Sequence, residues 1–181
     1  MANNNNFWNE ASRCGAIVGL VNVAFSAIGM FMPSISFVTS LVNFVATIYL
    51  LFHFARRRSL LYIKTGFTYS QSLGYIVAMG IFAGIISGAY QIVASNFLFV
   101  DLFEQTMNST IATLQQTGLY NNEMIDQMST MMRAYTFSPI PALLSNIVGN
   151  VLYFGFCGLF ISIGTKCDPD IFENNSEEEE E

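Results

Sequence analysis

The chain has 181 residues, of which 52% are hydrophobic and only 11% are charged. Soluble domains carry about 25% charged residues, so this composition disfavours a soluble enzyme or a nucleic-acid-binding protein and indicates a membrane protein. The formal net charge of −6 is concentrated at the C-terminus, because residues 173–181 contain six of the 13 acidic residues. We predict one membrane domain over residues 1–167 and an acidic, disordered cytoplasmic tail over residues 168–181.

Four apolar stretches approach or exceed the length of about 20 residues that a helix needs to cross a bilayer. They cover residues 14–32, 35–54, 73–100 and 142–163, and none has Asp, Glu, Lys or Arg within it. Pro33 separates the first two stretches, which predicts a tight turn between two helices. The predicted fold is therefore all-α, a polytopic membrane protein with four transmembrane helices.

The segment 101–141, between the third and fourth spans, is too long for an ordinary structureless loop. Its apolar residues recur at helical spacing, first from Phe103 to Leu114 and then from Met124 to Tyr135. We predict a short helical cap made of two amphipathic helices. The cap either binds a partner or a lipid headgroup, or its helices pack on each other or lie in the membrane interface.

The basic residues predict the orientation of the chain. Six of the seven Lys and Arg fall on the side that holds both termini, and only Arg133 lies in the segment between the third and fourth spans. The positive-inside rule then places both termini in the cytoplasm. Four bases between the second and third spans are expected to contact anionic lipid headgroups: Arg56, Arg57, Arg58 and Lys64. The aromatic residues proposed as interfacial anchors are Trp8, Tyr62, Tyr69, Tyr75 and Tyr153.

Glycines recur every four positions in two of the predicted spans. They are Gly15 and Gly19 in the first span, and Gly80, Gly84 and Gly88 in the third. Small residues on one helical face let two backbones approach closely, so this spacing predicts tight helix packing in lipid. The contact is either within one chain or between two copies of it.

Each span also contains uncharged polar residues near its middle. An amide exposed to lipid is costly, so we expect these side chains to face the bundle interior. The set comprises Asn22, Asn43, Thr47, Gln91, Asn96, Asn146 and Asn150. From it we predict a polar pocket in the outer half of the bundle, formed by Tyr90, Gln91, Asn146 and Asn150. The pocket is either a ligand or transport site or a set of hydrogen bonds that fixes helix packing.

The chain has few residues that could act in catalysis or bind a metal. His53 is the only histidine, and the three cysteines, Cys14, Cys157 and Cys167, form no C-x-x-C pair. No phosphate-binding loop, nucleophile motif or paired carboxylates accompany them. Methionine thioethers in the segment before the fourth span are ligands for Cu(I), but no Cys or His lies beside them, and methionine is also a common apolar filler. We predict no catalytic residue, no metal and no cofactor, and expect that the protein is not an enzyme.

Four short segments follow one another in a recognisable order: residues 7–11 (FWNEA), 66–72 (GFTYSQS), 99–105 (FVDLFEQ) and 138–139 (SP). Together they resemble a family of small four-helix membrane proteins of Bacteroidota that is catalogued as a domain of unknown function. Leu102 stands where that family often has proline. The resemblance implies a bacterial inner-membrane location. Because members are often encoded near polyprenyl-phosphate glycosyltransferases, it also implies an accessory role in envelope glycan assembly.

The leading hypothesis is a non-catalytic membrane scaffold or accessory subunit. Its partner would be another membrane protein, a second copy of the chain or a lipid-linked substrate, with no role for nucleic acid. The alternative is a small transporter or channel that uses the polar pocket, and a lipid or metal sensor is a third interpretation. No charged residue lies within the predicted spans, which disfavours ion-coupled transport.

Overall fold

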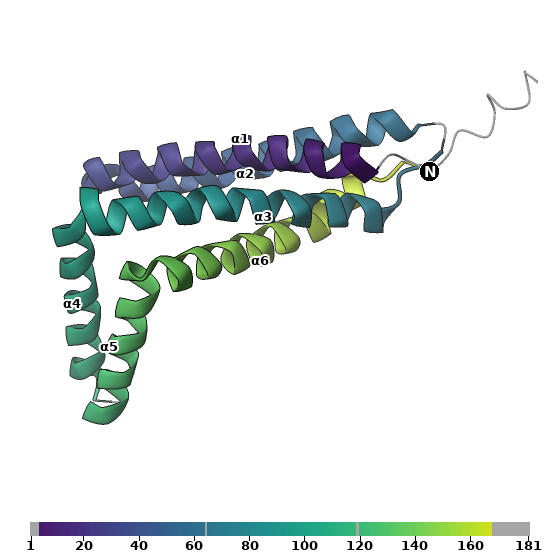
Figure 1. Ribbon diagram of the computed structural model, residues 1–181. Coiled ribbons are helices and arrows are strands. Elements are labelled where there is room, and N and C mark those ends of the chain that lie inside the picture. Colours follow the sequence, from purple (N-terminus) through teal and green to yellow (C-terminus); the bar gives the residue numbers. More distant parts are fainter. Residues whose placement is uncertain (1–3, 64, 119, 168–181) are drawn as a thin grey trace, which may run out of the picture.

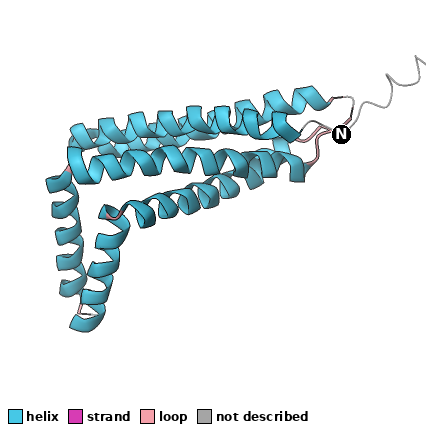
Figure 2. Cartoon of the chain, in the orientation of Figure 1, coloured by secondary structure: helices cyan, strands magenta, loops and turns pink. Residues whose placement is uncertain are grey.

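A computed structural model describes residues 4–63, 65–118 and 120–167 of the chain. Lys64 and the acidic tail 168–181 therefore lie outside the described residues. The described chain is almost entirely helical (Figure 2). Its α-helices are α1 (Asn4–Phe31), α2 (Ser36–Ser59), α3 (Tyr69–Val93), α4 (Val100–Thr117), α5 (Asn122–Phe137) and α6 (Pro139–Thr165). Three shorter helical segments are η1 (Pro33–Ile35), η2 (Leu60–Tyr62) and η3 (Ala94–Leu98).

Four helical stretches are long and apolar enough to cross a membrane. They are Asn6–Phe31, Ser36–Tyr62, Tyr69–Leu98 and Pro139–Thr165. This confirms the predicted all-α fold with four candidate membrane spans. The observed stretches are longer than the apolar ones because hydropathy marks only the part of a helix suited to lipid, whereas polar residues extend its ends.

The long helices run side by side, with α3 at the centre of the bundle. Helix α3 packs against both α1 and α6, α2 packs against α1, and the contact between α2 and α6 is sparser. Helices α4 and α5 pack together, run crosswise to the long helices and project beyond α6 (Figure 1). We call the end of the bundle that carries α4 and α5 the hairpin end, and the opposite end, near the N-terminus, the terminal end. The two helices predicted between the last two spans are present, but they project sideways instead of covering the bundle.

Local sequence signals explain where several helices begin. Thr68 starts α3 with a capping box, in which its hydroxyl accepts from Gln71 N at 3.3 Å and its own N–H donates to Gln71 Oε1 at 2.9 Å. Helix α6 begins at Pro139, in the first turn where a missing N–H costs nothing. The side chain of Asn121 caps α5 by accepting from Met124 N at 2.8 Å.

The third span, predicted over residues 73–100, runs from Tyr69 to Leu98 and changes its helical form near its end. Its last turn widens into the π-helical segment η3, where Phe99 N donates to Ala94 O at 2.8 Å. The buried hydroxyl of Ser95 donates to Thr136 O, at the end of α5, at 2.9 Å. This bond joins the widened turn to the returning hairpin and helps to set the direction in which α4 leaves the bundle.

The glycines predicted to mark a packing face lie between helices of the same chain. A Cβ atom added at Gly84 would lie 2.6 Å from Ile147 Cα, and one at Gly80 would lie 3.1 Å from Asn150 O. On the other side of α3, a Cβ at Gly15 would lie 2.5 Å from Met79 O. Backbone approaches this close leave no room for a side chain, so the glycines hold α3 between α1 and α6.

Arg58 is buried at the terminal end, which corrects its predicted role as a headgroup-binding base. Its side chain forms an ion pair with Glu10, and its guanidinium carbon lies 4.9 Å from the ring centre of Phe7 and 4.7 Å from that of Tyr75. Nη2 also donates to the Tyr62 hydroxyl at 3.3 Å. The interaction joins α1, α2, η2 and α3. Tyr75 is fully buried in this contact, so it is not an interfacial anchor.

Candidate functional site

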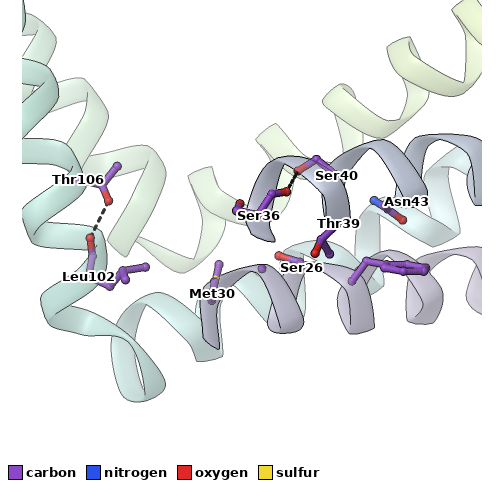
Figure 3. Close-up of a pocket in the computed structure, with 10 residues that line it drawn as sticks. Ser26, Met30, Ser36, Thr39, Ser40, Asn43, Leu102 and Thr106 are labelled. Atoms are coloured by element: carbon purple, nitrogen blue, oxygen red, sulfur yellow. Dashed lines mark hydrogen bonds between the residues drawn. The ribbon is translucent and has the colours of Figure 1, made fainter. Parts of the chain in front are cut away.

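Two adjoining pockets open the bundle at its hairpin end. The larger has a volume of about 590 Å³ and lies between α1, α2 and the first turns of α4 (Figure 3). The smaller has a volume of about 360 Å³ and reaches α3 and α6. Ser26, Met30 and Asn43 line both, so we treat the two as one site, the hairpin-end cavity. Its other lining residues are Asn22, Val23, Phe25, Gly29, Ser36, Thr39, Ser40, Ser87, Tyr90, Gln91, Leu102, Phe103, Thr106, Asn146 and Asn150.

The structure brings together all four residues of the predicted polar pocket, Tyr90, Gln91, Asn146 and Asn150, in the smaller lobe. Asn146 Nδ2 donates to Gln91 Oε1 at 2.6 Å, which joins α6 to α3 across the wall of the cavity. The Tyr90 hydroxyl donates to the sulfur of Met30, at 3.7 Å, and so connects α3 to α1. These bonds position the side chains that line the lobe and also fix the packing of the helices around it.

The larger lobe was not predicted from the sequence. Helix α2 contributes Ser36, Thr39, Ser40 and Asn43 to its wall. These residues are spaced three to four positions apart, so they share one helical face. This spacing is the feature of the sequence from which a polar face of α2 could have been predicted. Asn22, on α1, was expected to face the bundle interior, and it accepts from the Thr47 hydroxyl at 2.9 Å.

Most hydroxyl groups in the larger lobe donate to backbone carbonyls of their own helix. Ser40 Oγ donates to Ser36 O at 2.8 Å, and Thr106 Oγ1 donates to Leu102 O at 2.8 Å (Figure 3). Thr39 Oγ1 likewise donates to Ile35 O at 3.0 Å. Each hydroxyl has a single hydrogen and two lone pairs, so this arrangement uses the hydrogen and leaves acceptor capacity on the oxygen. The lobe therefore presents hydrogen-bond acceptors to whatever occupies it.

Asn43 lies where the two lobes meet, and its side-chain oxygen lacks a hydrogen-bond partner among the described residues. This oxygen, Oδ1, is buried. A buried acceptor without a partner costs about 1–3 kcal/mol, and this free energy is regained if the Asn43 side chain turns its Oδ1 toward a donor in the cavity. A ligand with hydroxyl or N–H groups fits this requirement.

The cavity is uncharged. Among the described residues that line it, none has a carboxylate, imidazole, guanidinium or thiol group. His53 lies toward the terminal end, where its ring stacks on Tyr49 with centroids 6.1 Å apart. Within the described part of the chain, His, Cys, Asp and Glu form no cluster of three or more suited to a metal ion. The arrangement is suited to holding a neutral, hydrogen-bonding molecule.

The family comparison places this cavity within a recognised domain. The model of a family described as "Protein of unknown function (DUF4199)" matches residues 13–166, a range that contains every residue lining the cavity. The match confirms the resemblance to a domain of unknown function. No curated protein and no solved structure matches the chain.

Proposed function

Because the chain belongs to the DUF4199 family, for which no activity is described, we propose its function from the chemistry of the hairpin-end cavity. In this proposal the protein is a non-catalytic membrane accessory subunit, and its cavity holds the sugar portion of a lipid-linked molecule. It serves envelope glycan or lipid-linked sugar assembly by presenting that molecule to a membrane-protein partner.

The observation that carries the proposal is the unpaired, buried Oδ1 of Asn43 in an uncharged cavity lined by hydroxyl and amide groups. A sugar has several hydroxyl donors and no charge, so it can satisfy these acceptors. A charged group in the same place would lose its hydration without gaining a counter-charge. The lining therefore favours a neutral polyol over a phosphate or an ammonium group.

The position of the cavity supports a ligand that arrives from the bilayer. In the smaller lobe, Asn43 of α2 lies across from Asn146 and Asn150 of α6, two helices that make only a sparse contact. Deeper in the bundle, the rings of Phe44 and Tyr153 lie 6.3 Å apart and narrow this gap. A lipid-linked sugar could place its sugar between α2 and α6 while its phosphate and hydrocarbon chain remain outside the cavity.

Charge supports the proposed orientation, with both termini in the cytoplasm of a bacterial cell and the hairpin end outside. Arg56, Arg57 and Lys166 are exposed at the terminal end, whereas Arg133 is on the hairpin. The cavity would then open toward the outer leaflet of the inner membrane. A membrane-protein partner or a second copy of the chain completes the proposed assembly.

The experiment measures binding of a short-chain polyprenyl-phosphate glucose to the full chain in nanodiscs. The matched control ligand is the methyl ester of the same polyprenyl phosphate, which has the same single phosphodiester charge but no sugar. We expect the sugar to strengthen binding at least tenfold, and we expect this difference to disappear in a folded Gln91→Leu/Asn146→Leu/Asn150→Leu variant. Equal binding of the two lipids to the wild-type chain would reject the proposal.

The alternative, a small transporter, is favoured by the depth of the cavity, since transporters often place substrate sites near the middle of the bilayer. Against this alternative, fully buried side chains fill the bundle on the terminal side of the cavity, including Val18, Leu51, Met79 and Phe154. Transport would require this core to open. Sugar flux into proteoliposomes that the triple leucine variant abolishes would favour the transporter over the accessory subunit.

A further inference from the structure

Helix α5 has an apolar stripe that α4 does not cover. Met124, Met131 and Tyr135 are 48%, 56% and 49% exposed. At about 100° per residue these three positions lie within about 40° of one another around the helix. Asp126 and Arg133 lie on the opposite face, about half a turn away. The exposed side of α5 is therefore amphipathic, although α5 is already packed on α4 through other residues.

Met131 and Tyr135 of this stripe line one wall of an apolar groove in the corner between α5 and α6. The groove has a volume of about 770 Å³, and its other wall is the face of α6 that runs from Ile140 to Leu152. Leu144, Val148 and Leu152 on that wall are each more than half exposed. Twelve residues of helix span about 18 Å, close to the roughly 15 Å hydrocarbon depth of one leaflet.

The direction of the hairpin places this groove at the membrane surface. Because α6 is a candidate membrane span, a hairpin that runs crosswise to it lies along the plane of the membrane (Figure 1). The groove occupies the corner between the hairpin and the lipid-facing side of α6. Lipid of that leaflet would therefore lie beneath α5, while Asp126 and Arg133 face water.

We propose that the α4–α5 hairpin rests on the membrane surface and that the α5–α6 groove holds the acyl chain of a lipid from the adjacent leaflet. The groove continues the exposed apolar face of α6, and the charged face of α5 is turned away from it, as in helices that lie in the membrane interface. The site is distinct from the hairpin-end cavity: Asn146 and Asn150 line the cavity, whereas Leu144, Val148 and Leu152 line the groove.

Fluorescence quenching tests the position of the hairpin, because Trp8 is the only tryptophan of the chain. In a Trp8→Phe background, Tyr135→Trp and Arg133→Trp place a single reporter on the groove side and on the opposite side of α5. In vesicles of phosphatidylcholine brominated on its acyl chains, we expect at least threefold stronger quenching of the Tyr135→Trp reporter. Iodide in the buffer should show the reverse preference.

The outcomes separate lipid from the other possible occupants. Strong iodide quenching of Tyr135→Trp, with little quenching by bromine, would show that the groove is open to water. Quenching by neither would show that protein covers it, as expected for a second copy of the chain. Either result overturns the proposal.

A second measurement tests the groove itself. Gly149 lines it, and a Cβ added there meets no atom within 4 Å, so Gly149→Leu can fill the groove without a clash at Cβ. Gly74 has equally open surroundings on α3, which makes Gly74→Leu the matched control. In native mass spectra of protein extracted from phosphatidylcholine vesicles, we expect Gly149→Leu to lose a bound lipid that wild type and Gly74→Leu retain. Equal lipid retention by all three proteins would contradict the proposal.

Discussion

The two ends of the bundle use polar side chains differently. At the terminal end they join separate elements: Arg58 pairs with Glu10, and the hydroxyls of Ser72 and Thr165 lie 2.7 Å apart between α3 and α6. At the hairpin end, Thr39 and Ser40 donate within their own helix, and the Asn43 oxygen has no described partner. Polar groups join separate helices at both ends, through Arg58 and Glu10 at the terminal end and through Asn146 and Gln91 at the hairpin end. At the hairpin end, the hydroxyls of α2 also leave acceptors available to a ligand.

Backbone pairing strengthens the same contrast. Phe67 N donates to Cys167 O at 2.7 Å, and Cys167 N donates to Phe67 O at 3.0 Å. This bridge ties the segment before α3 to the segment after α6. We expect the hairpin-end cavity to reduce the stability of the bundle, as binding sites commonly do, and the contacts at the terminal end to offset that loss. The following substitutions test this division.

The largest expected loss of stability comes from Arg58→Ala. The variant removes three ring contacts and leaves Glu10 without its partner in a partly buried position. We expect a loss of about 2–3 kcal/mol, below the usual range for a broken buried ion pair because Glu10 retains some exposure to solvent. Thermal unfolding of the full chain in detergent measures this loss.

Arg57→Ala is the matched control, because Arg57 is exposed on the same helix. Its stability should stay within about 0.5 kcal/mol of wild type. If the two variants unfold at the same temperature, the Arg58 interaction does not hold the terminal end together.

Arg58 also shows where prediction from sequence reached its limit. A base close to the end of an apolar stretch is expected to meet headgroups, and Arg56 and Arg57 are indeed exposed. The partner of Arg58, however, lies 48 residues earlier in the chain, and its aromatic contacts come from three different elements. Only the packed bundle brings them together, so no local pattern could identify the interaction.

The spans and part of the cavity were predictable for a different reason. Lipid excludes unpaired polar groups, so apolar length identifies a span, and amides such as Gln91 and Asn146 must face inward. The position of a hydroxyl is harder to predict, because the hydroxyls of Thr39 and Ser40 donate to backbone carbonyls of their own helix. Such a bond can form on any face of a helix. Their contribution to the cavity depended on how α2 packs beside α1 and α4.

A smaller effect is expected at the glycine contact that forms a rigid wall beside the cavity. In Gly84→Ala, the new methyl group would lie 2.6 Å from Ile147 Cα, so α6 must move away from α3. We expect a loss of about 2 kcal/mol, typical of overpacking, and weaker sugar binding as Asn146 shifts with α6. Thermal unfolding and the nanodisc binding measurement detect the two effects.

Gly74→Ala serves as the control for this variant, because its methyl group meets no atom within 4 Å. It should leave both stability and binding close to wild type. Unchanged stability of Gly84→Ala would mean that α3 and α6 can separate slightly without loss, and the wall would then not be rigid.

The smallest expected change has the opposite sign. Asn43→Leu removes the buried oxygen that has no partner, so we expect the bundle to gain about 1 kcal/mol in the free energy of unfolding. The same variant should lose most of the sugar-dependent binding, because the acceptor shared by both lobes is gone. Thr47→Val provides the comparison, since it breaks the 2.9 Å bond to Asn22 and should lower stability by about 1 kcal/mol. A decrease in stability for Asn43→Leu would show that Asn43 holds the helices together, and the contrast between the two ends would not hold at this residue.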